Sequence, residues 1–309
     1  MNITQNSIVH TYACISWILY LSFNNIINYK LLQKKIWKYK KIYKKNGLDG
    51  VWLYFVNKNF KKTGFNNYID IRKNALGAKI QRLSRNEILY GPYSRVKIIN
   101  SYGWSNLDFA TKYLGTYEAH IQEKIIFLSR KYKLNNFIDL GAAEGYHIIS
   151  LLKKNYFSKG SAFEINAKSR NLLKKNAVLN GVLKKMSIFS TATFDSLRKN
   201  LNKQDLKKML FLVDIEGHEF KLFDKKFCNH FSKCFFIVED HNFNMPNTKI
   251  LSNFYKTIKK NFYVEFIRDQ SKKPFEITIL DKFSDDEKYL MMSEGRSQTM
   301  RWIVLKPKW

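Results

Sequence analysis

The feature that most constrains the fold is an alternation of short apolar segments with helical patterns over the second half of the chain. Strands that alternate with helices are joined by right-handed crossovers, which produce a parallel sheet covered on both faces. We predict strands at 136–141, 160–165, 186–190, 209–215 and 234–239, with helices at 144–155, 167–180, 195–207 and 218–226 between them.

Two more apolar segments come late in the chain. A helix predicted at 248–261 leads to "FYVEFIRD" (262–269), and the chain ends on "MRWIVLKP" (300–307). Two late strands after five alternating units suit a sheet whose edge reverses direction. The predicted fold is therefore α/β, with a Rossmann-like, doubly wound, mostly parallel sheet of seven strands.

The first 110 residues are less regular. Apolar residues at steps of three and four predict a basic amphipathic helix over 30–45, whereas 47–102 reads as irregular and 105–133 as one helix. We predict three parts: an apolar then basic, mainly helical extension (1–45), an accessory or substrate-side region (46–110) and the main domain (111–309).

The N-terminal extension has the charge order of a membrane segment. Residues 8–27 carry no Lys, Arg, Asp or Glu, and the lysine-rich 29–45 follows. Polar side chains such as His10 and Asn24 interrupt the apolar run, so a spanning helix, a peripheral membrane contact through 1–45 and a buried helix all stay open.

Charge and cysteine content limit the partners and the compartment. A net charge of +29 at pH 7 attracts nucleic acid or anionic lipid, although lysines spread along the whole chain are equally typical of an AT-rich coding sequence. Three cysteines, Cys14, Cys228 and Cys234, fit neither a disulfide framework nor a zinc module. We expect a cytoplasmic protein that could associate with a membrane.

Small residues crowd the first strand-to-helix turn, "NFIDLGAAEGYHIISLL" (136–152). Such a turn lets the backbone approach a ligand at the N-terminus of the next helix. The spacing fits neither G-x-G-x-x-G nor a P-loop, and Asp139 and Glu144 flank it. Carboxylates repel phosphate and attract a cation, so S-adenosylmethionine, which has a sulfonium and an ammonium but no phosphate, fits best.

A second acidic residue supports this choice of ligand. Glu164 comes 19 residues after Gly145, at the end of the second strand. A carboxylate there can accept both ribose hydroxyls as a bidentate pair.

Four segments resemble the FkbM-like family of class I S-adenosylmethionine-dependent methyltransferases: "FIDLGAAEGYH", "AFEINAKSRNLLKKNAVLNGV", "LFLVDIEGHEFKLFD" and "FIVEDHNF". The resemblance covers about 110–309 and implies that fold and that cofactor, with varied hydroxyls of natural products and glycans as acceptors. It implies adenine contacts near the third strand, around 190–193. The candidate cofactor-binding residues are Asp139, Gly141, Ala142, Ala143, Gly145, Glu164, Ile165, Thr191 and Asp214.

Candidate catalytic residues follow the fourth and fifth strands. "VDIEGHE" (213–219) places Asp214, Glu216 and His218 at one strand end, and "IVEDH" places Glu239 and His241 on the same side of the next. Removing a hydroxyl proton needs a base, and we favour His241, with its near-neutral ordinary pKa, oriented by Glu239 or Asp214. Helix capping and ordinary loop hydrogen bonds are the alternative roles. We predict no metal, although these groups could hold a divalent ion.

We therefore predict an S-adenosylmethionine-dependent methyltransferase that acts on a hydroxyl of a saccharide or another small molecule. The alternative is an RNA methyltransferase, acting on ribose or base, which the basic charge favours. A third reading is a binding module that keeps the fold without catalysis.

Overall fold

The computed structural model describes residues 68–99, 107–245, 247–296 and 299–308. Residues 70–309 form one compact unit, to which the following description refers. The predictions for 8–27, 30–45 and Cys14 fall outside the described residues. Within the described part, no helix combines the length and the apolar character needed to cross a membrane.

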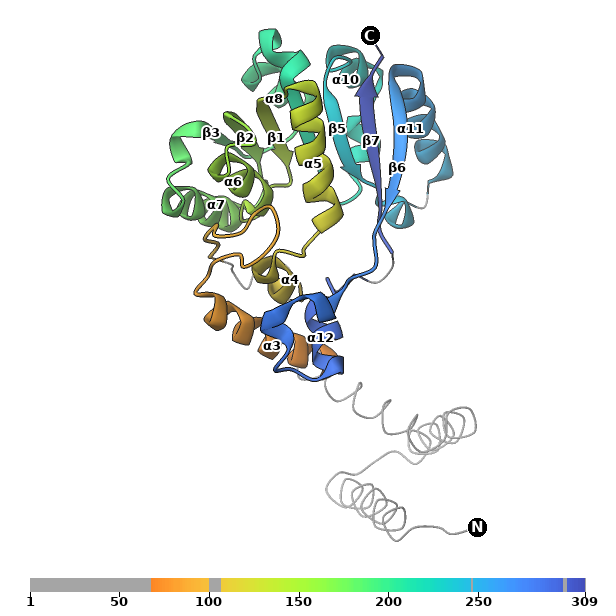
Figure 1. Ribbon diagram of the computed structural model, residues 1–309. Helices are drawn as coiled ribbons and strands as arrows, with labels where there is room; N and C mark the ends of the chain where they lie inside the picture. Colours follow the sequence, from red (N-terminus) through yellow and green to blue (C-terminus); the bar gives the residue numbers. More distant parts are fainter. Residues whose placement is uncertain (1–67, 100–106, 246, 297–298, 309) are drawn as a thin grey trace, which may run out of the picture. The chain divides into compact units, whose positions relative to one another are not determined.

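The predicted sheet of seven strands is confirmed, in the order β3-β2-β1-β4-β5-β7-β6 (Figure 1). β1 to β5 are parallel, so the carboxyl ends of these strands share one edge. The strands are β1 (Asn136–Leu140), β2 (Lys159–Phe163), β3 (Met186–Phe189), β4 (Met209–Val213), β5 (Phe235–Glu239), β6 (Phe262–Arg268) and β7 (Arg301–Pro307).

The reversed strand is β7, which is antiparallel to both of its neighbours. It lies between β5 and β6, so the strand at the edge itself, β6, runs with the parallel set. The register pairs Trp302 of β7 with Glu239 of β5. Because β7 is reversed, the start of β7 lies at the edge where β1, β4 and β5 end.

Helices cover both faces of the sheet, which buries the strands β1, β4 and β5 completely. On one face, Ile121, Ile148 and Leu173 pack in one core cluster. Leu197, Phe227 and Phe254 pack on the other. The first face is covered by α5 (Ala119–Tyr132), α6 (Tyr146–Lys153) and α7 (Ala167–Leu179), and the second by α8 (Phe194–Asn200), α9 (Glu219–Leu222), α10 (Lys225–His230) and α11 (Thr248–Asn261).

A smaller cluster lies beside the sheet, where Leu76 and Ile80 of α3 (Tyr68–Ser84) pack with Tyr113 and Met291. These partners come from α4 (Phe109–Leu114) and α12 (Asp285–Met292). Short 3-10 turns complete the described elements: η1 (Leu183–Lys185), η2 (Lys203–Lys208), η3 (Asn242–Asn244), η4 (Pro274–Glu276) and η5 (Thr278–Leu280). The boundary predicted at residue 110 stays a prediction.

Several predicted helices differ from the structure. The helix expected over 105–133 divides into α4 and α5, because Gly115 takes a left-handed conformation (φ 78°) against the carbonyl of Tyr90. The predictions at 195–207 and 218–226 each cover two elements, and Asp224 caps α10 by accepting a bond from the N–H of Phe227. The region 47–102 was expected to be irregular but contains the 17-residue helix α3.

Candidate functional site

The turn between β1 and α6 is built so tightly that it requires glycine. Gly141 has φ 90°, and a Cβ there would lie 1.8 Å from the carbonyl oxygen of Asp214. At Gly145, a Cβ would lie 2.3 Å from Cδ1 of Leu173. The small residues therefore bring the ends of β1 and β4 together and let α6 pack against α7.

Four N–H groups of this turn are committed within the protein. Those of Gly141 and Ala142 donate to the carbonyl of Phe163, at 2.8 and 3.1 Å. The N–H of Ala143 donates to Oε2 of Glu164 at 2.9 Å, and that of Gly145 to the carbonyl of Ala142. A phosphate held at such a turn needs N–H groups free to donate, so these contacts disfavour a dinucleotide.

Glu164 lies at the tip of β2 against the turn, as the sequence predicted. The side chain is buried, and its second oxygen accepts a bond from the N–H of Asn166, which caps α7. The adjacent Ile165 has 76% of its surface exposed. Thr191 is also exposed, between β3 and α8. The tip of β2 thus offers a carboxylate and an apolar side chain to a ligand, and the loop after β3 offers the hydroxyl of Thr191.

The two acids that flank the turn do not act as the sequence argument assumed. Burial raises the pKa of Asp139 to about 7, so this carboxyl is partly protonated at neutral pH. Glu144 binds Nζ of Lys112 at 2.6 Å, and Lys112 also binds Asp108 at 2.8 Å. Much of the expected negative charge beside the turn is therefore neutralised.

The predicted catalytic residues do come together at the tips of β4 and β5. Nε2 of His241 lies 3.3 Å from Glu239, 3.6 Å from Asp214 and 3.7 Å from Glu216. His218 is exposed, with Nδ1 3.2 Å from the carbonyl of Ile215. Ligand atoms of Asp214, Glu216 and His241 lie within 4.8 Å of one another, close enough to share a cation. The absence of a metal stays a prediction.

Glu219 orients His241. The Glu219 side chain is fully buried, and its Oε1 accepts hydrogen bonds from Nδ1 (3.0 Å) and from the backbone N–H (3.2 Å) of His241. The other oxygen accepts the N–H of Gly217. The sequence pattern had predicted Glu239 or Asp214 in this role. Glu219 is the last residue of "VDIEGHE" and lies in the helix predicted after β4. This position close behind the strand end was the sequence signal that could have identified Glu219 as a site residue.

The surrounding carboxylates change the expected charge of His241. Burial lowers its pKa, but the bonds to Glu219 and Glu239 and the nearby Asp214 outweigh burial and raise it to about 11. The imidazole is therefore a cation at neutral pH, and the neutral base assumed from the ordinary pKa is not present. Burial, together with the charge of Glu239, raises the pKa of Asp214 well above its ordinary value.

Arg296, which no sequence motif indicated, joins separate parts of the site. Its guanidinium pairs with Glu239 and Glu118, and Nε donates to Glu294 at 2.9 Å. Burial raises the pKa of Glu118, but His147 and Arg296 outweigh it and hold that pKa at about 2. A lone arginine in a late loop carries no pattern that predicts these contacts.

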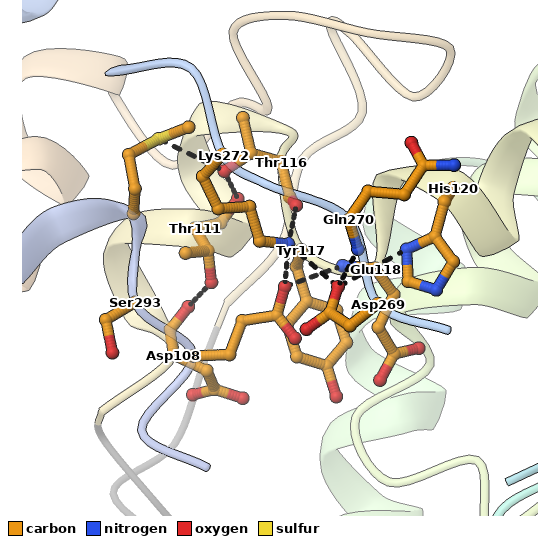
Figure 2. A network of polar contacts seen from close by, with 12 residues as sticks. Asp108, Thr111, Thr116, Tyr117, Glu118, His120, Asp269, Gln270, Lys272 and Ser293 are labelled. Carbon is orange, nitrogen blue, oxygen red and sulfur yellow. Dashed lines mark hydrogen bonds and ion pairs between the residues drawn. The ribbon is translucent and has the colours of Figure 1, made fainter. Parts of the chain in front are cut away.

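The segment before α5 is fixed by the loop after β6 and by the loop before β7. Figure 2 shows this network, in which Nζ of Lys272 donates to the carbonyl of Thr116 at 3.4 Å. Nδ1 of His120 lies 3.6 Å from Asp269, and Glu294 accepts the backbone N–H of Glu118. These contacts hold Tyr117 and Glu118 over the strand ends.

A cavity of about 60 Å³ lies beneath this segment, next to the turn. Its lining comprises Lys112, Tyr117, Glu118, Asp139, Gly141, Ala142, Ala143, Glu144, Tyr146, His147, Leu212, Asp214 and Trp302. A larger open hollow, about 720 Å³, lies on the outer side of α5 and contains none of the predicted site residues; its lining is Pro92, Glu123, Ile126, Phe127, Arg130, Lys131 and Tyr156.

No protein-family model and no curated protein matches this sequence. Solved methyltransferases resemble its fold. The METTL16 methyltransferase domain has a TM-score of 0.49 and 14% identity, covering 76% of this chain and 80% of that one. An O-methyltransferase from Bacillus cereus in complex with SAH has 0.41 and 12%, covering 60% and 81%. A precorrin-6y methyltransferase from Geobacter metallireducens has 0.40 and 10%, covering 62% and 88%.

Proposed function

We infer that this chain is an S-adenosylmethionine-dependent methyltransferase that methylates a hydroxyl of a saccharide or another small molecule. One observation carries the inference: four N–H groups of the turn after β1 are committed within the protein, while Glu164 lies directly on this turn. Such a site suits a nucleoside whose ribose needs a carboxylate and which has no phosphate. The FkbM-like resemblance agrees with this choice and stays a prediction.

We expect different parts of the cofactor to bind at the ends of different strands. Glu164 and the exposed Ile165 mark the ribose and adenine end at β2. The turn at Gly141 and the cavity beside it lie towards β4, where Asp214 stands. When bound, S-adenosylmethionine supplies a methyl group activated by a sulfonium. The acceptor must then reach the methyl from the side of Asp214, Glu216 and His241, because transfer needs an in-line approach.

Asp214 is the base that this geometry favours. Its raised pKa makes the Asp214 carboxylate a stronger acceptor for a hydroxyl proton than an ordinary carboxylate. Its Oδ1 is buried and accepts no hydrogen bond from the described residues. His241, held as a cation by Glu219, stands 3.6 Å from Asp214 and can stabilise the carboxylate before the proton arrives. The roles of Glu216 and Glu239 remain predictions.

The charge at the strand tips bears on the acceptor. Glu216, with 64% of its side chain exposed, and Asp214 present carboxylates where the acceptor would approach. Carboxylates repel phosphodiesters, which favours a neutral hydroxyl. The net charge of +29 supports the alternative, RNA, as the acceptor. RNA is therefore included as a substrate in the test.

Calorimetry tests cofactor binding. We expect wild-type protein to bind S-adenosylmethionine and Glu164→Ala to bind it about tenfold to a hundredfold more weakly, since a hydrogen bond to a charged group contributes ~1.5–3 kcal/mol. Glu276→Ala, which removes an exposed carboxylate paired with Lys273, is the matched control and should bind normally. Equal affinity of the Glu164 variant would contradict the proposed site.

A labelled methyl donor identifies the acceptor class. Purified protein is incubated with the donor and with separate saccharide, small-molecule and RNA fractions of a cell extract. Label in the saccharide or small-molecule fraction supports the proposal, whereas label confined to RNA replaces it with the alternative. Cofactor binding without transfer to any fraction would favour a non-catalytic module.

A further inference from the structure

Trp302 carries a buried hydrogen-bond donor that the described protein does not use. The side chain is 1% exposed, and its Nε1–H finds no acceptor among the described residues. A buried donor without a partner is costly, so each such group in a native structure requires an explanation. Trp302 also lines the cavity beside the turn.

The position of Trp302 relates this donor to the proposed cofactor. Along this edge of the sheet the strands follow one another in the order β2, β1, β4, β5 and β7. Glu164, the carboxylate proposed to bind the ribose, lies at the end of β2, and Trp302 lies at the start of β7. A cavity of about 60 Å³ holds only a few non-hydrogen atoms, because one water-sized group needs ~10–15 Å³ of such space. A nucleoside bound at Glu164 therefore stays outside, and a small end group enters.

The charges around the cavity indicate what that end group is. Asp139, Glu118, Glu144 and Asp214 supply carboxyl oxygens that can accept hydrogen bonds from an ammonium, although Lys112 and Arg296 already balance the charges of Glu144 and Glu118. Lys112, a cation in the lining, already binds Asp108 and Glu144. A carboxylate that enters the cavity would thus find an uncommitted donor at Trp302. The amino-acid end of S-adenosylmethionine carries an ammonium and a carboxylate on the same carbon.

We propose that the indole N–H of Trp302 donates a hydrogen bond to the α-carboxylate of S-adenosylmethionine, with the amino-acid end of the cofactor in this cavity. The assignment rests on the proposed function. The donor is left without a partner in the protein because the ligand provides the acceptor.

Trp302→Phe removes the N–H and keeps an aromatic ring, and three ligands separate the outcomes. S-adenosylmethionine and S-adenosylhomocysteine have the carboxylate, whereas decarboxylated S-adenosylmethionine lacks it. We expect the variant to bind the first two ~10- to 100-fold more weakly than wild type, and the third with unchanged affinity. Equal weakening for all three ligands, or none for any, overturns the assignment. Failure of wild-type protein to bind S-adenosylmethionine removes the proposed function as well.

A control variant and an NMR measurement address the case in which Trp302→Phe loses affinity because it is less well folded. Ile303→Val changes the neighbouring residue, which packs on the opposite face, and should leave the affinities for all three ligands unchanged. The ligand-free Trp302→Phe variant should still unfold cooperatively, with a lower melting temperature than this control because the smaller ring leaves a cavity in the core. Should the variant not fold, the 15N indole resonance of wild-type Trp302 replaces it. This resonance should move downfield with the two carboxylate ligands and stay in place with the decarboxylated one, and the same shift with all three overturns the assignment.

Discussion

Replacing Gly141 by alanine tests whether the tight turn builds the site. Alanine at φ 90° incurs a left-handed backbone cost of ~1–2 kcal/mol. Its Cβ would also lie 1.8 Å from the carbonyl oxygen of Asp214, about half an ordinary contact distance, and overpacking of this kind costs ~1–3 kcal/mol more. The expected loss of unfolding free energy is therefore ~2–5 kcal/mol.

Gly181→Ala separates the two costs. Gly181 has φ 70°, and a Cβ there meets no atom within 4 Å, so only the backbone cost of ~1–2 kcal/mol applies. Urea denaturation of both variants gives the difference, and thermal midpoints should differ by ~2–4 °C for each kcal/mol. Calorimetry should show weaker cofactor binding for Gly141→Ala alone. Equal stabilities together with equal affinities would refute the idea that close approach of β1 and β4 shapes the pocket.

Two further predictions concern the cluster at the tips of β4 and β5. Asp214→Asn should lower kcat by ~10²–10⁴-fold with little change in cofactor affinity, because it removes the proposed base, whereas the exposed Asp195→Asn should retain activity; unchanged kcat excludes Asp214 as the base. His241 has a pKa raised from 6.5 to about 11 on folding, so its charge stabilises the folded state fully below pH 6.5, and this stabilisation is lost as pH rises towards about 11. In urea titrations from pH 6 to pH 10, the stability advantage of wild type over His241→Gln should therefore shrink, and an advantage independent of pH would contradict the assigned charge.

Periodicity predicted the main elements because the strands that form the centre of the sheet are apolar throughout. β1, β4 and β5 are buried along their whole length, which is the pattern of a parallel sheet covered on both faces. The break between α4 and α5 was missed, since it depends on the carbonyl of Tyr90 next to Gly115. That approach joins residues 25 positions apart.

The sequence by itself determined the order of strands and helices, the glycine turn and the acids at the strand tips. These features follow from local spacing, because the carboxyl ends of parallel strands meet at one edge. The tertiary structure decided the charge of each group. Whether Glu144 is neutralised by Lys112, whether His241 holds its proton, and whether Trp302 finds an acceptor depend on residues distant in the chain, whose burial and neighbours no local pattern encodes.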